Sequence, residues 1–491
     1  MTTRRSFISG IAAFATCANR PAGLWSQATA TSSQPLTLYI NPMKILATMP
    51  KDFTGLSYES AQLGHPNFFA PENTSLISLF QTLAREGVLR IGGNTAEYTR
   101  WSSDDADAQK NLTPHAMGPD AGTAAKTASI LTPLAIRNLN GFITKVGGWR
   151  VIYGLNLWHG TPKNAAAEAA YVAKTLGPRL ICFQIGNEPD MDHDQGSKDR
   201  WTFDHYWDRW QTFQAAVKQA VPEARFAGPD IAKELDWITK MAEKQPDIDF
   251  LTGHYYAEGP PANPKMTLEY LLKRGKDPAS GEIAIVQAAT KALSKPYRMS
   301  EGNSCFHGGK PLVSDTLASA LWGSDYMLQV AQAGYIGVNL HGGGNGLYTP
   351  IAGDTPQGFK ARPVYFGMLL AERFAGSTFI EASLSAQSAD QNVTAFAAVD
   401  DASSTKSCKL AIFNKAAAPV TVNLNGVPAS TQAAVQWLKA PAIDSHDNVT
   451  FGGSQVGPAG EFSPKTEASM KIRHGSGILH IPAYTAAYIK G

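Results

Sequence analysis

Two glutamates stand where a pair of carboxyl groups can do chemistry together. Glu188 comes directly after the apolar run 180–186, with Asn187 before it and a proline after it, and Glu301 follows the apolar run 297–300. A carboxyl group at a strand end, flanked in this way, is held in a defined orientation. Two carboxyl groups about 5 to 5.5 Å apart form a retaining glycosidase pair, in which one protonates the glycosidic oxygen and the other attacks the anomeric carbon.

The elements that must position these carboxyl groups are eight short apolar runs that alternate with helical patterns. The runs are residues 53–58, 88–92, 149–157, 180–186, 226–228, 250–256, 297–300 and 335–340. Segments 164–176 and 316–333 are two of the helices, with apolar residues three and four positions apart. Eight strand-then-helix units predict an α/β fold, the (β/α)8 or TIM barrel. Strands four and seven lie on opposite sides of such a barrel, so Glu188 and Glu301 are expected to face each other across its mouth.

The pattern changes after about residue 376, where alternating strands follow without long helices. We expect strands at 393–399, 409–413, 420–424, 433–438, 477–481 and 483–489, separated by Pro, Gly, Asn and Asp as in an antiparallel sandwich. The run 36–40, ahead of the barrel, is expected to return as one strand of that sandwich. We therefore predict a catalytic barrel over residues 50–375 and an accessory antiparallel β-sandwich built from residues 34–49 plus 376–491.

The N-terminus has the features of an export signal. Arg4 and Arg5 form a twin-arginine pattern ahead of a mildly apolar run, 8–18, that is too short to span a bilayer as a mature helix. Twin-arginine export carries folded proteins across a bacterial inner membrane. We predict that residues 1–33 are a signal and linker and that the mature protein is periplasmic or secreted, without a membrane anchor. The alternative is a chance arginine pair on a tail.

The net charge argues against a nucleic-acid partner, and the spacing of the cysteines shows no redox or metal motif. The chain has 43 Lys and Arg against 41 Asp and Glu, a net charge of +2, so it lacks the basic stripe of a nucleic-acid-binding protein. Cys17 falls in the predicted signal, and Cys182, Cys305 and Cys408 are far apart without a C-x-x-C motif, so we expect buried small side chains. The sequence gives no indication of oligomeric state.

Two motifs, one for calcium binding and one for a lipase oxyanion hole, are incomplete in this sequence. Asp190-x-Asp192-x-Asp194 begins like a calcium loop but lacks its glycine and its final glutamate, so we read it as a polar rim beside Glu188. His341 and the glycines after it resemble a lipase oxyanion motif, yet no G-x-S-x-G nucleophile elbow accompanies them. We therefore expect no metal and no cofactor.

The chain resembles glycoside hydrolase family 79, a family of clan A retaining enzymes that contains bacterial β-glucuronidases and the heparanases. The resemblance covers nearly all of the chain after the signal and is carried by Gly55-Leu-Ser-Tyr-Glu59, Leu89-Arg-Ile-Gly-Gly-Asn94, Tyr153-Gly-Leu-Asn156, Gly186-Asn-Glu-Pro-Asp190, His254-Tyr-Tyr256, Ser300-Glu-Gly-Asn-Ser304 and His341-Gly-Gly-Gly344. It implies a barrel with a β-sandwich, Glu188 as the acid/base and Glu301 as the nucleophile.

The resemblance also implies roles for residues around the two glutamates. Asn187 is expected to bind the sugar 2-hydroxyl, and Tyr256 to hold the nucleophile ionised through its phenol. A core tyrosine on a barrel strand is the alternative for Tyr256. Glu59 and Asn94, after the first and second strands, are expected to bind sugar hydroxyls at the mouth.

Recognition of a sugar carboxylate in this family uses backbone N–H groups of a glycine-rich stretch after the nucleophile, together with tyrosine hydroxyls. The corresponding residues are Phe306, His307 and Gly308, followed later by Tyr348. The family's β-glucuronidases resemble this loop but have a tyrosine in place of Phe306. Losing one hydrogen bond to a charged group costs about 1.5 to 3 kcal/mol. We therefore expect weaker uronate binding, compensation by His307, or a modified sugar.

The predicted function is a retaining exo-β-glucuronidase that removes terminal β-linked glucuronic acid from glycans or glycosides by double displacement. Long loops at 63–73, 101–120 and 257–265 are expected to close the site into a pocket. An endo-acting, heparanase-like enzyme on acidic polysaccharide is the nearest alternative, but the net charge of +2 disfavours the basic cleft that it needs. A non-catalytic glycan-binding protein on a glycosidase scaffold is the second alternative, and such a protein need not keep both carboxyl groups.

Overall fold

The computed structural model describes residues 34–111, 129–191, 201–274, 280–342, 346–354, 357–401, 404–428 and 432–491. The predicted signal at 1–33, Asp192 and Asp194, and part of the predicted loop 101–120 lie outside the described residues. Within the described ranges, no helix has both the length and the apolar character needed to cross a membrane.

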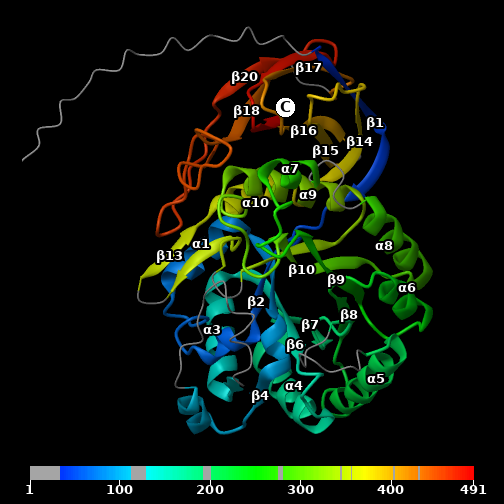
Figure 1. Ribbon diagram of the computed structural model, residues 1–491, viewed down its shortest axis with the longest axis vertical. Coiled ribbons are helices and arrows are strands. Elements are labelled where there is room, and N and C mark those ends of the chain that lie inside the picture. The colour runs from blue at the N-terminus through cyan, green and yellow to red at the C-terminus, as the bar shows by residue number, and fades with distance from the viewer. Residues whose placement is uncertain are drawn as a thin grey trace, which may run out of the picture. The chain divides into compact units, whose positions relative to one another are not determined.

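Eight parallel strands close into a barrel, which confirms the predicted (β/α)8 fold (Figure 1). In order around the barrel they are β2 (Thr54–Glu59), β3 (Glu86–Gly92), β6 (Gly148–Leu155), β7 (Leu180–Ile185), β8 (Phe226–Ile231), β9 (Phe250–Glu258), β10 (Tyr297–Cys305) and β11 (Gly337–His341). β8 and β10 continue three and five residues past their predicted ends at Gly228 and Ser300. Each has an irregularity in register near that end, after which it resumes pairing with β9.

Helices follow the barrel strands and cover their outer faces. They are α1 (Thr74–Leu83), α3 (Pro133–Val146), α4 (Pro162–Leu176), α5 (Phe203–Ala220), α6 (Asp236–Glu243), α7 (Leu268–Arg274), α8 (Ser280–Leu293), α9 (Leu317–Gln332) and α10 (Pro363–Glu372). Local chemistry sets several of their starts. The Thr161 and Thr202 hydroxyls accept from backbone N–H groups at the beginnings of α4 and α5, as N-cap residues do.

Shorter elements occupy the loops at the barrel ends. They are the 3-10 helices η1 (Ser60–Gly64), η2 (Asn94–Tyr98), η3 (Asp105–Lys110) and η4 (Gly177–Arg179), the strand pair β4 (Thr99–Trp101) and β5 (Ser129–Leu131), and the hairpin β12 (Ile351–Asp354) and β13 (Gly358–Ala361). The eighth barrel strand is thus followed by a hairpin before its helix, α10.

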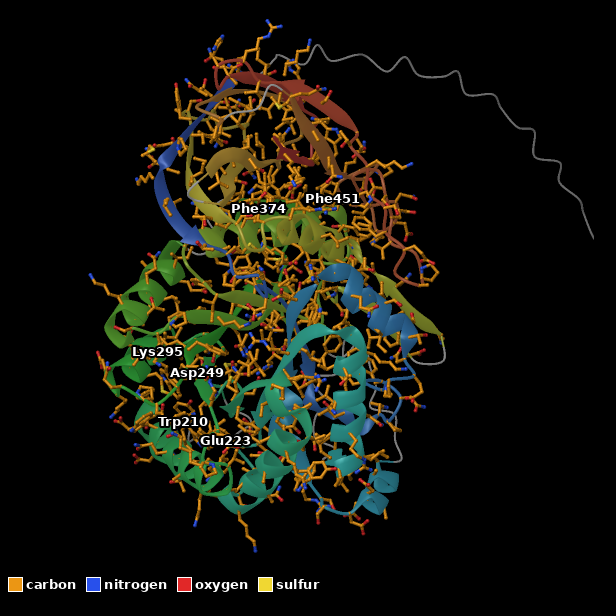
Figure 2. The ribbon with its side chains drawn as sticks, turned by 180° about the vertical axis from the view of Figure 1, so that it is seen from behind. Trp210, Glu223, Asp249, Lys295, Phe374 and Phe451 are labelled. Atoms are coloured by element: carbon orange, nitrogen blue, oxygen red, sulfur yellow. The ribbon has the colours of Figure 1, made fainter. Side chains whose placement is uncertain are left out.

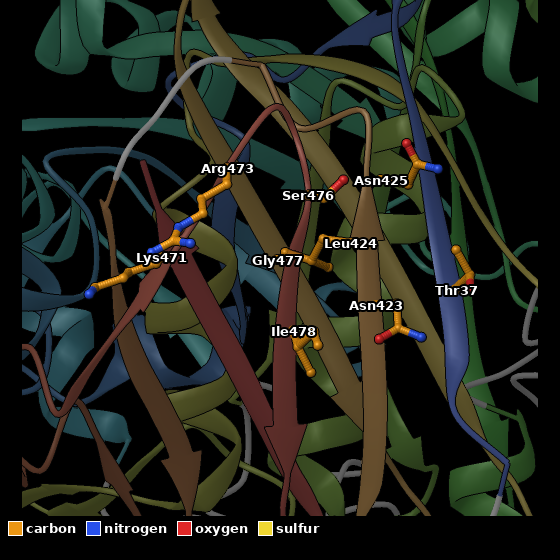
Figure 3. A pocket seen from close by; sticks show the side chains of 9 residues that line it. All are labelled: Thr37, Asn423, Leu424, Asn425, Lys471, Arg473, Ser476, Gly477 and Ile478. Carbon is orange, nitrogen blue, oxygen red and sulfur yellow. The ribbon is translucent and has the colours of Figure 1, made fainter.

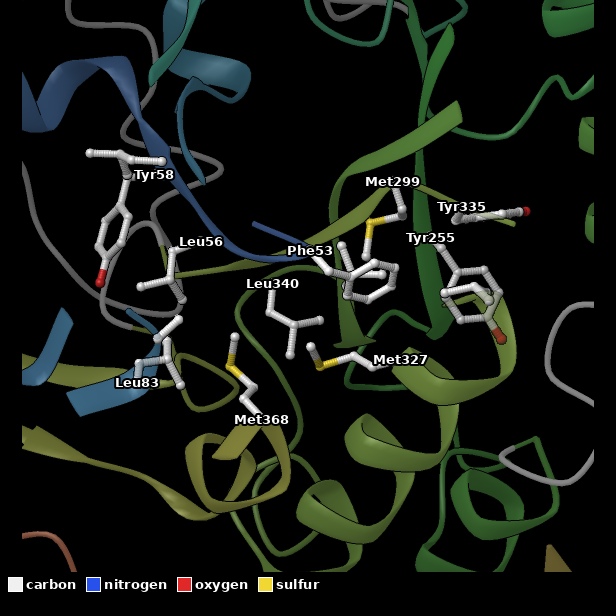
Figure 4. Packing of buried hydrophobic residues seen from close by; sticks show 14 of the residues in the cluster. Phe53, Leu56, Tyr58, Leu83, Tyr255, Met299, Met327, Tyr335, Leu340 and Met368 are labelled. Atoms are coloured by element: carbon white, nitrogen blue, oxygen red, sulfur yellow. The ribbon is translucent and has the colours of Figure 1, made fainter. Parts of the chain in front are cut away.

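The barrel core joins the strands to α9 and α10 (Figure 4). Met299 on β10 and Leu340 on β11 pack with Met327 of α9 and Met368 of α10 in one buried cluster. Both helices are apolar on nearly every side and almost wholly buried. A helix that is apolar all round must be covered on all faces, so the second sheet of the protein is needed to cover what the barrel leaves open.

That second layer is a curled, mostly antiparallel sheet, to which ten strands belong in the described part of the chain. They are β1 (Leu36–Thr48), β14 (Thr378–Leu384), β15 (Val393–Asp401), β16 (Ser404–Asn414), β17 (Val420–Asn425), β18 (Gln432–Lys439), β19 (Thr450–Phe451), β20 (Ala468–Lys471), β21 (Gly477–Ile481) and β22 (Thr485–Lys490). As predicted, the run at 36–40 returns to this sheet, where β1 pairs with β14 and β17. β14, β19 and β20 were not predicted from the sequence.

Aromatic side chains join the sheet to the barrel helices. Phe374, just after α10, stacks on Phe379 of β14 with ring centroids 5.8 Å apart, and it also contacts Tyr488 of β22. Phe451 of β19 lies 6.3 Å from the same tyrosine ring. Phe374 and Phe451 are labelled where the sheet meets the barrel helices in Figure 2. Aromatic groups dominate the energetics of such contacts because each buries a large apolar area.

Candidate active site

The two glutamates singled out in the sequence meet at the carboxyl ends of the barrel strands. Glu188 follows β7 in a left-handed backbone conformation, with φ of 46°, and its N–H donates to the carbonyl of Asp230 at 2.9 Å. Glu301 lies within β10. A carboxylate oxygen of each, together with a ring nitrogen of His254, all lie within 4.8 Å of one another. This spacing suits retaining glycosidases, at about 5 to 5.5 Å, better than inverting ones, at about 6.5 to 9.5 Å.

Glu301 is held as a carboxylate. Arg90 donates to its Oε2 at 2.6 Å and the Tyr256 hydroxyl donates to its Oε1 at 2.8 Å. Burial raises the pKa of Glu301, but the charges of His341, His254 and Arg90 together lower it to about 2. Burial also keeps Tyr256 protonated by raising its pKa. The carboxylate is therefore ionised at neutral pH and oriented by two donors, as a nucleophile requires.

Arg90 on β3 contacts more of the site residues than Glu301 alone, and its role was not predicted from the sequence. Its fully buried guanidinium also donates to Asp230 Oδ2 at 2.6 Å, to Asn187 Oδ1 at 2.7 Å and to Gln184 Oε1 at 3.0 Å. A planar fork with five donors can serve several acceptors at once. Arg90 thus fixes Glu301 and Asn187 against each other. An arginine inside an otherwise apolar strand was the signal that could have revealed it.

His254 on β9 links Glu188 to a third carboxylate. Its Nδ1 lies 2.9 Å from Glu188 Oε1, and its Nε2 makes an ion-pair contact of 3.3 Å with Asp230 Oδ1. Burial lowers the pKa of His254, but Asp230, Glu301 and the hydrogen bond to Glu188 raise it to about 10. The ring is therefore an imidazolium at neutral pH, with one N–H directed at Glu188.

Asp230 reaches this position through irregularities in two neighbouring strands. It is the extra residue where the β8–β9 register shifts, with φ of 63°, and Ser300 is the extra residue where the β9–β10 register shifts. The Ser300 hydroxyl and the Gln184 amide both donate to Asp230 Oδ1. Burial raises the pKa of Asp230, but Arg90 and His254 outweigh it and hold that pKa well below its usual range. Bulges next to active sites commonly re-aim a side chain in this way.

The residues predicted to bind sugar hydroxyls lie beside this network. The Asn187 amide donates to Asn94 Oδ1 at 3.2 Å, and the backbone N–H of Asn187 donates to Glu97 at 2.6 Å. Glu59 accepts from the backbone N–H and the hydroxyl of Thr95, and its Oε1 lies 3.5 Å from His341 Nε2. The structure thus brings Glu59, Asn94 and Asn187 to the same mouth, and adds Glu97 and His341 to them.

The loop predicted to meet a sugar carboxylate lies on the other side of Glu301. The rings of Phe306 and Tyr348 lie 6.3 Å and 6.2 Å from the ring of Tyr256, which donates to Glu301, so both belong to the wall beside Glu301. The carbonyl of Gly308 accepts from the N–H of Leu347, which joins this loop to the segment that carries Tyr348. His307 is exposed, and its ring contacts that of Phe306.

The position of Asp190 differs from the one predicted. We read it as part of a polar rim, but it is buried, and its carboxylate accepts from the backbone N–H groups of Ala232, Lys233 and Glu234. It anchors the loop after β8 to the segment that carries Glu188. Cys182, Cys305 and Cys408 are buried and free, as expected.

The cluster of Glu188, His254 and Glu301 also has the spacing of a metal site. A metal-bound histidine must be neutral. His254 instead faces a carboxylate with each ring nitrogen, and its pKa is raised to about 10. Without a cation in the cluster, His254 therefore holds a proton between Glu188 and Asp230.

No family model matches the sequence. A curated β-glucuronidase from Aspergillus niger is 24% identical over 364 residues, which are 66% of this chain and 62% of the relative, and a β-glucuronidase from Neurospora crassa is 24% identical over 359 residues. The chain thus spans less than two thirds of the length of the curated relatives that it matches.

Solved structures cover almost the whole chain. A 4-O-α-L-rhamnosyl-β-D-glucuronidase from Fusarium oxysporum superposes with a TM-score of 0.75 and 18% identity, over 93% of this chain and 99% of that one. A family 51 α-L-arabinofuranosidase from Bifidobacterium longum has a TM-score of 0.66 and 14% identity, over 94% of this chain and 100% of that one. These similarities show the fold, a (β/α)8 barrel with an accessory β domain.

Proposed function

We propose that this chain is a glycoside hydrolase that releases β-linked glucuronic acid with retention of configuration. The observation that carries the proposal is the pair Glu188 and Glu301, whose carboxylate oxygens lie within 4.8 Å of each other while Glu301 is held ionised. The names of the two curated relatives and of the Fusarium enzyme support glucuronide as the substrate class.

In the first step, a carboxylate oxygen of Glu301 attacks the anomeric carbon while Glu188 gives its proton to the departing glycosidic oxygen. The C1–O bond to the leaving group breaks and a covalent glycosyl-enzyme forms. In the second step, Glu188 takes a proton from water, which attacks the same carbon and releases Glu301 as a carboxylate.

The surrounding residues supply the electrostatics of these steps. Once Glu188 has lost its proton, the His254 N–H that lies 2.9 Å from it stabilises the new carboxylate. Arg90 and Tyr256 hold Glu301 in position before attack and receive it again after release. Asn187 is placed by Arg90 and Asn94 to meet the sugar 2-hydroxyl.

We also propose that the chain belongs to glycoside hydrolase family 79 and that it acts on terminal residues, as an exo enzyme. The mature protein is exported after removal of residues 1–33. Carboxylate recognition is assigned to the loop of Phe306, His307 and Gly308 together with Tyr348. Because the Fusarium enzyme is named for a 4-O-substituted glucuronide, 4-O-modified glucuronides belong among the substrates tested.

The first experiment compares hydrolysis of p-nitrophenyl β-glucuronide and β-glucoside. We expect the glucuronide to be preferred at least about tenfold. Glu301→Gln should lower kcat by about a thousandfold or more, whereas Glu223→Gln, which changes an exposed carboxylate before the start of β8, at the end of the strand opposite the site, should leave kcat unchanged. Preference for the glucoside would contradict the assigned uronate site.

Azide rescue separates the roles of the two glutamates. In Glu188→Ala, azide can attack the glycosyl-enzyme from the face of the lost acid/base, so the expected product is the β-glycosyl azide. In Glu301→Ala, azide can replace the lost nucleophile and give the α-glycosyl azide. The anomeric configuration is read by proton NMR, and exchanged products would reverse the two assignments.

A further inference from the structure

The accessory sheet has an apolar inner face and, along β1, β17 and β21, a mostly polar face that points to solvent. Along β1, β17 and β21, alternate residues point into the sheet's own apolar cluster, among them Leu38, Val422 and Leu479. The residues between them point outward and are aligned by register: Thr37 is opposite Asn423, Tyr39 is opposite Asn425, and Asn423 is opposite Ile478. Because three neighbouring strands contribute, the outward residues form one continuous face.

This face is hollowed into a groove of about 530 Å³ (Figure 3). Asn423, Asn425 and Thr37 line it on one side of Ile478, and Lys471 and Arg473 line it on the other. Gly477 has no side chain to fill the floor between the two sides. The groove belongs to the accessory sheet and uses none of the residues of the candidate active site.

The charge of the groove is positive. Lys471 and Arg473 are exposed, and neither forms an ion pair within the part of the chain that the structure describes. No carboxylate is among the described residues that line the groove. Glu381, farther along the face on β14, is already bound by Lys44 and by the Asn41 amide. Two unpaired cations therefore favour an anionic ligand.

The neutral side chains specify the kind of anion. Asn423 and Asn425 lie two positions apart on one strand face, about 6.7 Å from each other, and each amide can donate and accept at once, as vicinal sugar hydroxyls require. The ring of Tyr39 is 51% exposed and Ile478 is 61% exposed, so both offer apolar surface to the face of a sugar ring. A nucleic acid would instead need a longer run of cations.

We propose that this groove binds an acidic oligosaccharide, a uronate-containing stretch of the glycan whose end the barrel hydrolyses. Carboxylates of the glycan meet Lys471 and Arg473, hydroxyls meet Asn423 and Asn425, and a sugar face covers Ile478. The assignment of this glycan as substrate rests on the proposed function, whereas binding in the groove does not depend on catalysis.

Affinity electrophoresis with the full chain carrying Glu301→Gln tests the groove without hydrolysis. The gels contain hyaluronan, in which the glucuronic acid is β-linked, as the acidic probe or hydroxyethyl cellulose as the neutral one. We expect hyaluronan alone to retard the protein, and the dissociation constant to rise at least about tenfold in Lys471→Ala/Arg473→Ala and in Asn423→Ala/Asn425→Ala. The matched control Lys163→Ala/Arg85→Ala removes two exposed cations from the barrel exterior and should bind as before.

Equal retardation of the groove and control variants, or retardation by the neutral polymer alone, would overturn the proposal. Circular dichroism verifies that each variant is folded. Hydrolysis of p-nitrophenyl β-glucuronide by the groove variants in the active background is expected to be unchanged, because that substrate does not reach the groove. Groove binding without glucuronide hydrolysis would refute only the proposed function, and hydrolysis without groove binding would refute only the groove.

Discussion

At the scale of single residues, buried charges of opposite sign contact one another in the site. Asp230 and Glu301 are carboxylates, Arg90 is a guanidinium and His254 is an imidazolium, and each contacts a group of opposite sign. Burial of an unpaired charge is costly, so each of these groups keeps its partner ionised. The proton near Glu188 is therefore controlled by Asp230, which the substrate need not touch.

Asp230→Asn should change how stability depends on pH. The folded-state pKa of His254 is about 10, above its ordinary value of 6.5, so its protonation stabilises the fold in full below pH 6.5 and this stability is lost as the pH rises through 10. Asp230 is the largest of the charges that raise this pKa, so removing its carboxylate should lower the pKa of His254 by about 1 to 3. The free energy of unfolding should then fall less between pH 7 and 10.

Urea unfolding at a series of pH values measures this dependence. Asp247→Asn is the matched control because Asp247 is exposed and its ion pair with Lys218 lies at the surface. Parallel pH profiles for wild type and Asp230→Asn would show that Asp230 does not hold the proton on His254.

At the scale of elements, the strand ends and the loops after them position the side chains of the site. β8 and β10 each carry an extra residue against β9, and these two residues, Asp230 and Ser300, hydrogen-bond to each other. The loop after β10 then returns to the segment after β11, where Gly308 binds Leu347. Phe306 at the start of that loop faces Tyr256, so the identity of one ring decides the polarity of the wall beside Glu301.

Phe306→Tyr should improve discrimination in favour of glucuronides. A new hydroxyl donor to the sugar carboxylate contributes about 1.5 to 3 kcal/mol, so kcat/KM for p-nitrophenyl β-glucuronide should rise by about tenfold or more. The value for the β-glucoside, which lacks the carboxylate, should stay the same. An equal change for both substrates would indicate altered packing against Tyr256 and not uronate recognition.

At the scale of the whole molecule, part of the accessory sheet belongs to the same apolar core as the barrel. The first two backbone N–H groups of α9 donate to carbonyls of Ser445 and Ile443 in the β18–β19 connection. Asp325 of α9 is fully buried against Lys415, which follows β16, and accepts from Thr394 of β15. The sheet thus completes the environment of a barrel helix.

Replacing one partner of this buried ion pair should destabilise the protein more than replacing both partners. Lys415→Met alone leaves the Asp325 carboxylate unpaired and should cost about 3 to 5 kcal/mol of unfolding free energy. The double variant Asp325→Leu/Lys415→Met should cost clearly less, because no buried charge is left. Guanidinium unfolding measures both, and Lys218→Met at an exposed pair should change stability by less than about 1 kcal/mol. A double variant as unstable as the single one would contradict this account.

Local pattern alone was enough to predict the eight barrel strands, the return of β1 to the second sheet and the pair Glu188 and Glu301. Apolar runs that end in polar residues report strand ends, and strand order in a barrel then brings the ends of strands four and seven together. Such information is present within a few neighbouring residues, which is why it could be found in the sequence.

Tertiary structure decided the rest of the site. Arg90, Asp230 and His341 join Glu301 because strands far apart in sequence pair in a particular register, and a shift of one residue turns a side chain to the other face. Asp190, predicted to belong to a polar rim, is buried because its acceptor oxygens meet N–H groups 42 to 44 residues away. Charge balance within a buried network depends on these distant contacts, and no local pattern records them.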